Sequence, residues 1–211
     1  MMGMRFLAVA GFAAIAAACA PIERSRNLND PAVPATTVAA QVCSDCHGLD
    51  GNSVSPNFPR LAGQPEDYLA SQLRQFRSHQ RSDPAGFVYM WGLSRHLTDA
   101  QIDGLARYFA AQSPAPNASG DPALAAKGRA IFETGVPALK VPPCATCHGA
   151  HGEGASTFPR LAGQHADYVR KQLAVFRGSE QRPEAAAMKI VAHDLTNEDI
   201  REVAEYVQGL R

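Results

Sequence analysis

The sequence has no excess of either charge, since 20 Lys and Arg residues balance 20 Asp and Glu residues in a chain of 211. When the chain is divided near Gln112, neither half carries an excess greater than about one charge, so the basic field that nucleic acid binding requires is missing. We therefore expect no nucleic-acid partner. With 45% hydrophobic and 19% charged residues, the composition is that of a globular protein and not of a disordered chain or a polytopic membrane protein.

Catalytic patterns are also absent. The sequence contains no Ser-His-Asp set, no glycine-rich phosphate loop and no pair of catalytic carboxylates beside its cysteine motifs. Chemistry at substrate atoms needs such groups in a defined arrangement. We therefore expect a protein that is not an enzyme.

Long apolar runs are confined to the N-terminus. Arg5 precedes an apolar run that ends in small residues at Ala18, and this pattern predicts a secretory signal peptide at 1–18. The run is about thirteen residues long, too short to cross a bilayer. We therefore expect export to the periplasm, followed by an N-terminal tether at 19–35.

Cys19 stands where the signal peptide would be cleaved and resembles the acylated cysteine of a bacterial lipoprotein. The match is imperfect, because Ala16 occupies a position where Leu is usual. A lipidated Cys19 would anchor the protein to a membrane surface, at about 0.8 kcal/mol per buried methylene. In the alternative interpretation, Cys19 is a chance residue in a signal that is simply removed.

The remainder of the chain contains one pattern twice. CSDCHG at 43–48 recurs as CATCHG at 144–149, and FPRLAGQ at 58–64 recurs unchanged at 158–164. The Tyr, Gln and Phe of a following helical stretch also recur, at 68, 72 and 76 and again at 168, 172 and 176. A Pro- and Ser-rich linker lies between the copies. The repeat predicts a first domain at 36–112, a linker at 113–120 and a second domain at 121–211.

Apolar residues within each copy follow helical periodicity, and no alternating strand pattern competes. We expect helices from about Pro65 to His79 and from His165 to Arg177. Thr98 with Gln101 predicts a capping box, and Asp121 before Pro122 predicts the start of another helix. Two apolar helix stripes correspond between the copies: Ile102, Leu105, Ala106 and Phe109, and Ile200, Val203, Ala204 and Val207. The fold class is therefore predicted to be all-α with long loops.

Each Cys-x-x-Cys-His run is typical of covalent haem c attachment. Two cysteines on one side of a helical turn can add to the vinyl groups of haem, and the adjacent histidine can bind the iron. We therefore expect two covalently bound haem c groups, on Cys43 and Cys46 with axial His47, and on Cys144 and Cys147 with axial His148.

Other uses of these cysteines fit less well. Zinc ribbons pair their Cys-x-x-Cys motifs at about 15 to 20 residues, whereas these motifs lie in separate copies. A thioredoxin-like pair would need a βαβ context, and a disulfide across this short loop would be strained. Each copy is also too small to supply more than about 3 to 5 kcal/mol from its own core. We therefore expect the haem to complete the core and the haem-free chain to be largely unfolded.

Met90 and Met188 occupy equivalent positions, seven residues before Leu97 and Leu195. A thioether ligand stabilises ferrous iron and raises the potential, and the paired placement favours both methionines as the second axial ligands. Core packing by these methionines and bis-histidine ligation by His96 and His193 are the alternatives. His79, His151 and His165 have no histidine counterpart in the other copy and are expected to be solvated.

The repeated loop string supplies candidates for the surroundings of each haem. Pro59 and Pro159 could offer a carbonyl to the axial histidine, and Leu61 and Leu161 could pack on the ring. Four further residues, Arg60, Arg160, Gln64 and Gln164, could meet haem propionates, although surface arginines are the simpler alternative for Arg60 and Arg160.

These motifs resemble the dihaem cytochrome c4 family, and the resemblance covers residues 36–211. It implies two tandem cytochrome c-like domains related by a pseudo-twofold axis, with propionates meeting near the interface. It also implies a periplasmic electron carrier between a respiratory complex or dehydrogenase and a terminal oxidase or similar acceptor, with redox proteins as donors and acceptors. The loop at 135–143 and Cys19 depart from the family pattern. The alternatives are a cytochrome subunit of a membrane dehydrogenase or oxidase complex and, less in keeping with the paired methionines, a dihaem peroxidase.

Overall fold

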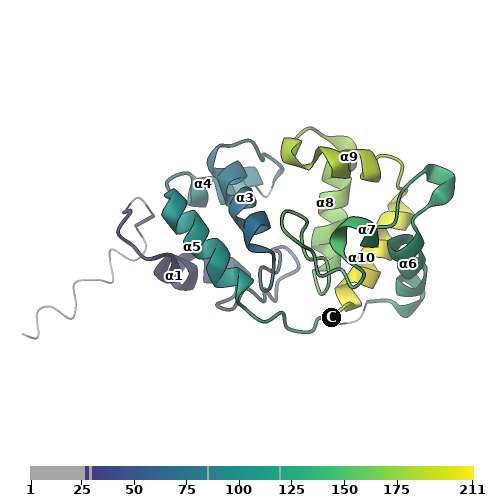
Figure 1. Ribbon diagram of the computed structural model, residues 1–211, viewed down its shortest axis with the longest axis horizontal. Coiled ribbons are helices and arrows are strands. Elements are labelled where there is room, and N and C mark those ends of the chain that lie inside the picture. Colours follow the sequence, from purple (N-terminus) through teal and green to yellow (C-terminus); the bar gives the residue numbers. More distant parts are fainter. Residues whose placement is uncertain (1–26, 29, 85, 119) are drawn as a thin grey trace, which may run out of the picture.

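The computed structural model describes residues 27–211 except 29, 85 and 119. Within this part of the chain the regular structure is helical, and β contacts are limited to the isolated bridges Val136–Val141 and Ala155–Phe158. Two lobes follow one another along the chain, one for each sequence copy, and the linker runs between them from α5 to α6 (Figure 1). The predicted all-α class is confirmed.

The described residues of the first copy form five short or medium helices and two π-helical turns. These are α1 (Ala35–Val38), η1 (Ala39–Cys43), α2 (Ser44–His47), α3 (Glu66–Arg77), η2 (Gly86–Met90), α4 (Trp91–Ser94) and α5 (Asp99–Ala110). The predicted capping box begins α5, because Thr98 accepts from the Gln101 backbone N–H and the Gln101 side chain returns to the N-cap. The stripe predicted on α5 is buried, and it packs with Val38 and Leu69 into the core of this copy.

The second copy repeats this order, with a longer first helix. It contains α6 (Pro122–Thr134), η3 (Pro137–Leu139), α7 (Ala145–His148), α8 (Ala166–Gly178), η4 (Pro183–Ala185), α9 (Ala186–Ala192) and α10 (Asn197–Gly209). Asp121 caps α6 and Pro122 is its first residue, as predicted. A Cβ atom added at Gly128 would lie 1.9 Å from the carbonyl oxygen of Glu202. The absence of a side chain at Gly128 therefore lets α6 and α10 cross closely.

The two copies meet through buried polar side chains. Arg81 donates to Gln72 in its own copy at 2.7 Å and to Gln172 of the second copy at 3.3 Å. Arg182 donates to Gln172 at 2.6 Å and to Gln72 at 2.8 Å. Exchanging the two copies reproduces the same contacts, which is what a pseudo-twofold axis requires. The predicted pseudo-symmetry is therefore confirmed.

Two carboxylates compensate the charges of these buried arginines. Asp83 lies 2.7 Å from Nε of Arg81, and Glu184 lies 2.9 Å from Nε of Arg182. Each arginine also stacks over an aromatic ring of its own copy, Phe76 or Phe176. The interface thus contains buried charges that are compensated within each copy, and this makes it sensitive to the loss of one partner.

Candidate functional site

His47 and His148 end the short helices α2 and α7, and both side chains are buried. Their Nδ1–H groups donate to the carbonyl oxygens of Pro59 and Pro159, each at 2.9 Å. These are the two hydrogen bonds expected from the sequence. Because a carbonyl can only accept, Nδ1 carries the proton in each ring and Nε2 keeps its lone pair. Nε2 is therefore free to bind a metal.

Burial lowers the pKa of both imidazoles, and the proline carbonyls oppose this effect only in part. Each ring is therefore neutral at physiological pH, the form that a metal ligand must have. The glycine after each histidine adopts positive φ, 80° at Gly48 and 86° at Gly149. This conformation, which L side chains rarely adopt, ends the helix directly after the imidazole.

None of the four motif cysteines forms a disulfide bond. Burial raises the pKa of Cys43 to about 12 and that of Cys144 to about 11. Within the described part of the chain, no three His, Cys, Asp or Glu side chains gather in a way that could hold a metal ion. A Cys-x-x-Cys pair with one neighbouring histidine therefore fits covalent haem attachment better than a zinc cluster.

In the first copy, both cysteines, His47 and Met90 line a single cavity whose other walls are almost entirely apolar. The remaining residues around it are Leu28, Val38, Val42, Phe58, Leu73, Leu93, Ser94, Leu97 and Leu105. An apolar cavity with an imidazole and a thioether among its walls suits a porphyrin with one nitrogen and one sulfur ligand. Leu28 belongs to the predicted tether, so that segment also contributes to the cavity.

Met188 in the second copy is half-buried and packs with Cys144 and Leu161 against the core of that copy. His96 and His193, the alternative ligands, are exposed, and His193 bonds to Asp194. Met90 thus shares a cavity with both cysteines of its motif, and Met188 packs on the same core as Cys144, whereas both alternative histidines lie at the surface.

Arg60 and Arg160 each carry a buried Nε–H that has no hydrogen-bond partner among the described residues. Arg60 Nη1 donates to the carbonyl of Ala115 in the linker at 2.7 Å. A buried N–H without a partner is costly, and an anionic group such as a haem propionate would satisfy it. Burial also lowers the pKa of both guanidinium groups. The loops that carry Arg60 and Arg160 therefore suit haem propionates. Contact of these two arginines with propionates stays a prediction.

Gln64 and Gln164 lie between the copies. The side chain of Gln164 contacts the backbone of Arg60, and that of Gln64 contacts the backbone of Arg160. Contact of either amide with a propionate stays a prediction. These contacts between the copies were not predicted from the sequence, although the unchanged repeat of FPRLAGQ, which contains both glutamines, was a signal.

His165 does not lie in solvent, so that expectation was wrong. Its side chain is buried, and Nε2–H donates to the carbonyl of Ser53 in the first copy at 2.8 Å. Nδ1 faces the amide nitrogen of Asn117 in the linker at 3.5 Å. The residue has no histidine counterpart because it fills one side of an interface whose symmetry is only approximate. His79 and His151 are exposed, as expected.

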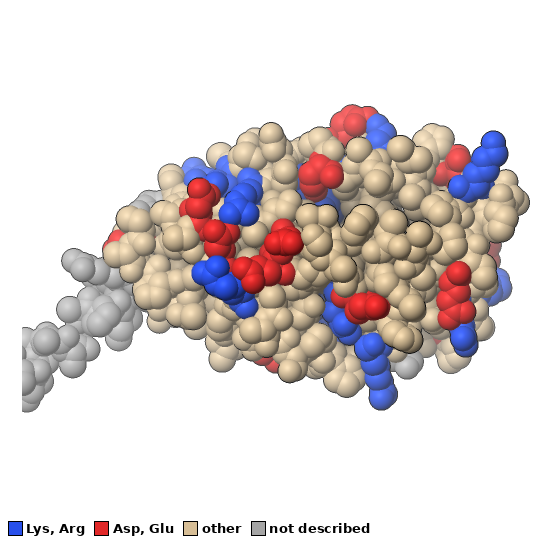
Figure 2. Space-filling model, viewed as in Figure 1, with Lys and Arg blue, Asp and Glu red and all other residues tan. Residues whose placement is uncertain are grey.

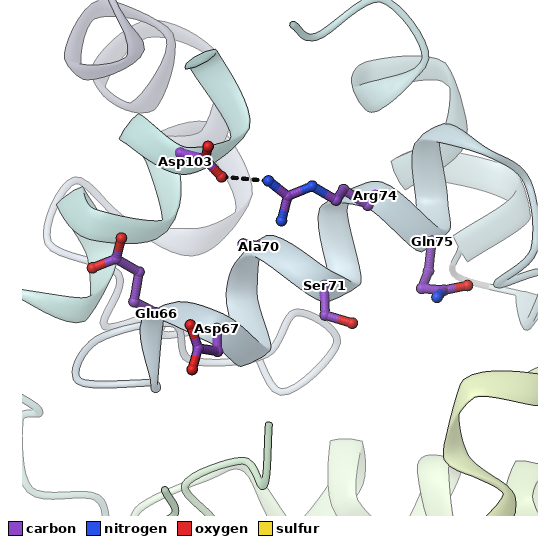
Figure 3. A pocket seen from close by; sticks show the side chains of 7 residues that line it. All are labelled: Glu66, Asp67, Ala70, Ser71, Arg74, Gln75 and Asp103. Carbon is purple, nitrogen blue, oxygen red and sulfur yellow. Dashed lines mark hydrogen bonds and ion pairs between the residues drawn. The ribbon is translucent and has the colours of Figure 1, made fainter. Parts of the chain in front are cut away.

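A surface groove between α3 and α5 contains none of the motif cysteines, axial histidines or methionines. It is lined by Glu66, Asp67, Ala70, Ser71, Arg74, Gln75 and Asp103, and Arg74 pairs with Asp103 at 2.6 Å (Figure 3). Both partners of this pair are substantially exposed, so the pair adds little stability. The chemistry of the motifs lies in the apolar cavity instead.

Comparison with known proteins gives a consistent result. The family model "Cytochrome c" matches residues 32–113 and 125–211. Cytochrome c4 of Pseudomonas aeruginosa is 42% identical over 175 residues, which cover 81% of this chain and 85% of the relative. The crystal structure of reduced recombinant cytochrome c4 from Pseudomonas stutzeri has a TM-score of 0.76 at 38% identity, covering 87% of this chain and 100% of that one.

A further relative differs in name. The thiosulfate dehydrogenase electron acceptor of Thiomonas intermedia is 34% identical over 187 residues, covering 83% of both chains.

Proposed function

This chain belongs to the cytochrome c family as a dihaem cytochrome c4 protein, an electron carrier with two covalently bound haem c groups, and we propose that it links a respiratory complex or dehydrogenase to a terminal oxidase or similar acceptor. It catalyses no reaction of its own in this proposal. The observation that carries the proposal is the first-copy cavity, in which both cysteines, His47 and Met90 share one apolar site.

We propose the following ligands and attachment points. Cys43 and Cys46 hold one haem, with His47 and Met90 on its iron, and Cys144 and Cys147 hold the other, with His148 and Met188. When bound, haem c supplies an iron that alternates between ferrous and ferric states. The thioether ligand favours the ferrous state and raises the potential.

The protein's own groups prepare each site for electron transfer. The proline carbonyls fix the axial imidazoles and increase their basicity, because each accepts the Nδ1–H proton. The apolar walls exclude water and so lower the local dielectric constant. Leu61 and Leu161 pack on the rings, and Arg60 and Arg160 meet the propionates, in this proposal.

A dihaem peroxidase would need an iron with an open position and an acid–base group beside it. Each copy instead offers both a histidine and a methionine, and with both bound neither iron would have an open position. A role as a subunit of a membrane dehydrogenase or oxidase complex would use the same electron-transfer residues.

The charge distribution gives no strong preference for a partner of one charge. On the face shown in Figure 2, acidic and basic side chains are intermixed, and the chain has no net charge. Strong electrostatic steering of one partner is therefore not built into this face. Relatives that are named as acceptors for thiosulfate dehydrogenase support a dehydrogenase as the donor.

We propose a periplasmic location, with Cys19 as a lipid anchor. Residues 1–18 and Cys19 lie outside the described residues, so this proposal rests on their sequence. Across the described residues, no helix is long and apolar enough to span a membrane.

A reductive titration of the purified, exported protein tests the proposed function. The protein should contain two haems, accept two electron equivalents per chain, and be reoxidised rapidly by membranes that contain a terminal oxidase. It should not reduce hydrogen peroxide at a rate above that of free haem. A single electron equivalent, or efficient peroxide turnover, would contradict the proposal.

A further inference from the structure

Gln64 and Gln164 make the same pair of hydrogen bonds, each to the opposite copy. Oε1 of Gln164 accepts from the backbone N–H of Arg60 at 2.9 Å, and its Nε2 donates to the carbonyl of Arg60 at 3.0 Å. Oε1 of Gln64 accepts from Arg160 N–H at 2.9 Å, and its Nε2 donates to the Arg160 carbonyl at 2.7 Å. Both side chains are buried. Each side-chain amide therefore makes two hydrogen bonds with the backbone of one residue in the other copy.

The backbone N–H of Arg60, which Gln164 accepts from, belongs to the peptide group that orients the axial histidine His47. The carbonyl of Pro59 and the N–H of Arg60 are the two ends of one peptide unit, which is planar. That carbonyl accepts from Nδ1–H of His47, while that N–H donates to Gln164. Fixing the direction of the N–H therefore also fixes the direction in which the carbonyl meets His47.

The same arrangement changes the strength of the histidine contact as well as its direction. A peptide whose N–H is hydrogen-bonded is polarised, and its carbonyl becomes a better acceptor. A better acceptor on Nδ1–H makes the imidazole more basic, and a more basic ligand stabilises ferric iron. His148, the Pro159–Arg160 peptide and Gln64 repeat the chain of contacts in the second copy.

We propose that Gln64 and Gln164 are positioning residues that act across the copies. Gln164 sets the ligand strength of His47, and Gln64 sets that of His148. This inference rests on the proposed role of both histidines as axial ligands. Neither haem site is then complete within its own copy, and a change at the interface is transmitted to both irons.

The test is the reduction potential of each haem in full-length holoprotein that carries Gln164→Leu or Gln64→Leu. The haems are assigned by NMR through their links to the two cysteine motifs. Gln164→Leu should favour reduction of the haem on Cys43 and Cys46 by about threefold in the equilibrium constant. Its reduction potential should therefore rise by about 28 mV for one electron. Gln164→Leu should also speed hydrogen exchange at Nδ1 of His47. Gln64→Leu should do the same for the other haem and for His148.

Gln72→Leu is the matched control, because Gln72 is a buried glutamine of the same interface that contacts Arg81 and Arg182 and not these peptides. Gln72→Leu should not produce the crossed pattern, in which the haem of the opposite copy shifts more than the haem of the variant's own copy. Gln164→Glu retains an oxygen for Arg60 N–H, so it keeps the test valid if the leucine variant does not accumulate. The ionised carboxylate strengthens that bond but cannot donate to the Arg60 carbonyl as Nε2 of Gln164 does. The variant is therefore measured at a pH where the introduced carboxyl is ionised, and there the potential of the haem on His47 should fall by more than that of the haem on His148.

A larger shift in the haem of the variant's own copy, an equal shift in both haems, or no shift in either would overturn the inference. Failure of the proposed ligands is recognised separately, because the unmodified protein would then lack a low-spin His/Met spectrum. An intact His/Met spectrum without the crossed pattern removes only the role of the glutamines.

Discussion

Nη2 of Arg182 in the second copy lies 2.8 Å from Oε1 of Gln72 in the first, and both side chains are buried. Together with Arg81 and Gln172, this contact makes the interface a closed set of charged and amide groups. Burial of a charge is tolerated only while its partner is present. The interface therefore fixes how the copies sit, and its failure should be abrupt rather than gradual.

Arg81→Met should destabilise the protein by about 3–5 kcal/mol, because it leaves the buried carboxylate of Asp83 without its cation. Denaturant unfolding of the holoprotein measures this loss. The double variant Arg81→Met/Asp83→Leu removes both charges and should recover most of it. A single variant as stable as the unmodified protein would show that the ion pair contributes nothing.

Mild acid should loosen the interface through His165. Burial lowers the pKa of this imidazole, and the nearby Arg60 adds to that effect, although the bond to Ser53 opposes it. The unfolded chain, with a His pKa of about 6.5, then binds more protons than the native state. Stability is therefore complete above about pH 6.5 and is lost as pH falls below it.

Protonation of His165 would also place an N–H against the amide donor of Asn117. Unfolding followed between pH 5 and pH 7.5 should show this decrease, and His165→Gln should reduce it. An equal pH dependence in the variant would assign the effect to another group.

Gly128→Ala should cost about 1–3 kcal/mol, because the new Cβ meets the Glu202 carbonyl at 1.9 Å and the helices must separate. Gly178→Ala is the control. It also lies in a helix, but its Cβ would meet nothing within 4 Å, so it should be neutral or stabilising by up to about 1 kcal/mol. Equal effects of both changes on thermal unfolding would contradict the close crossing of α6 and α10.

Cys43→Ala/Cys46→Ala should leave the first copy without its haem and largely unfolded, because its own apolar core is small. Circular dichroism should show a loss of helix confined to about one copy, with the second haem retained. A variant with the helical signal of the unmodified protein would show that the first copy folds without the cofactor.

The cysteine motifs, the helices and the proline–histidine bonds could be predicted because they depend on local spacing. The contacts of Gln64 and His165 could not. Comparison of the two copies shows that a residue recurs. A recurring residue can contact either a cofactor in its own copy or a residue of the other copy, and the sequence does not distinguish these cases. His165 is replaced by Pro65 in the first copy, and its burial depends on the packing of both copies with the linker, which no local pattern encodes.

The most direct test of the two-haem account is the visible spectrum of ferric Met90→Ala and of ferric Met188→Ala. An Fe–S(Met) bond gives ferric iron a weak red absorption band, and each variant should lose about half of it while keeping both haems attached and its other iron low-spin. Full retention of the band in both variants would contradict methionine ligation, and exported protein without haem would contradict the account as a whole.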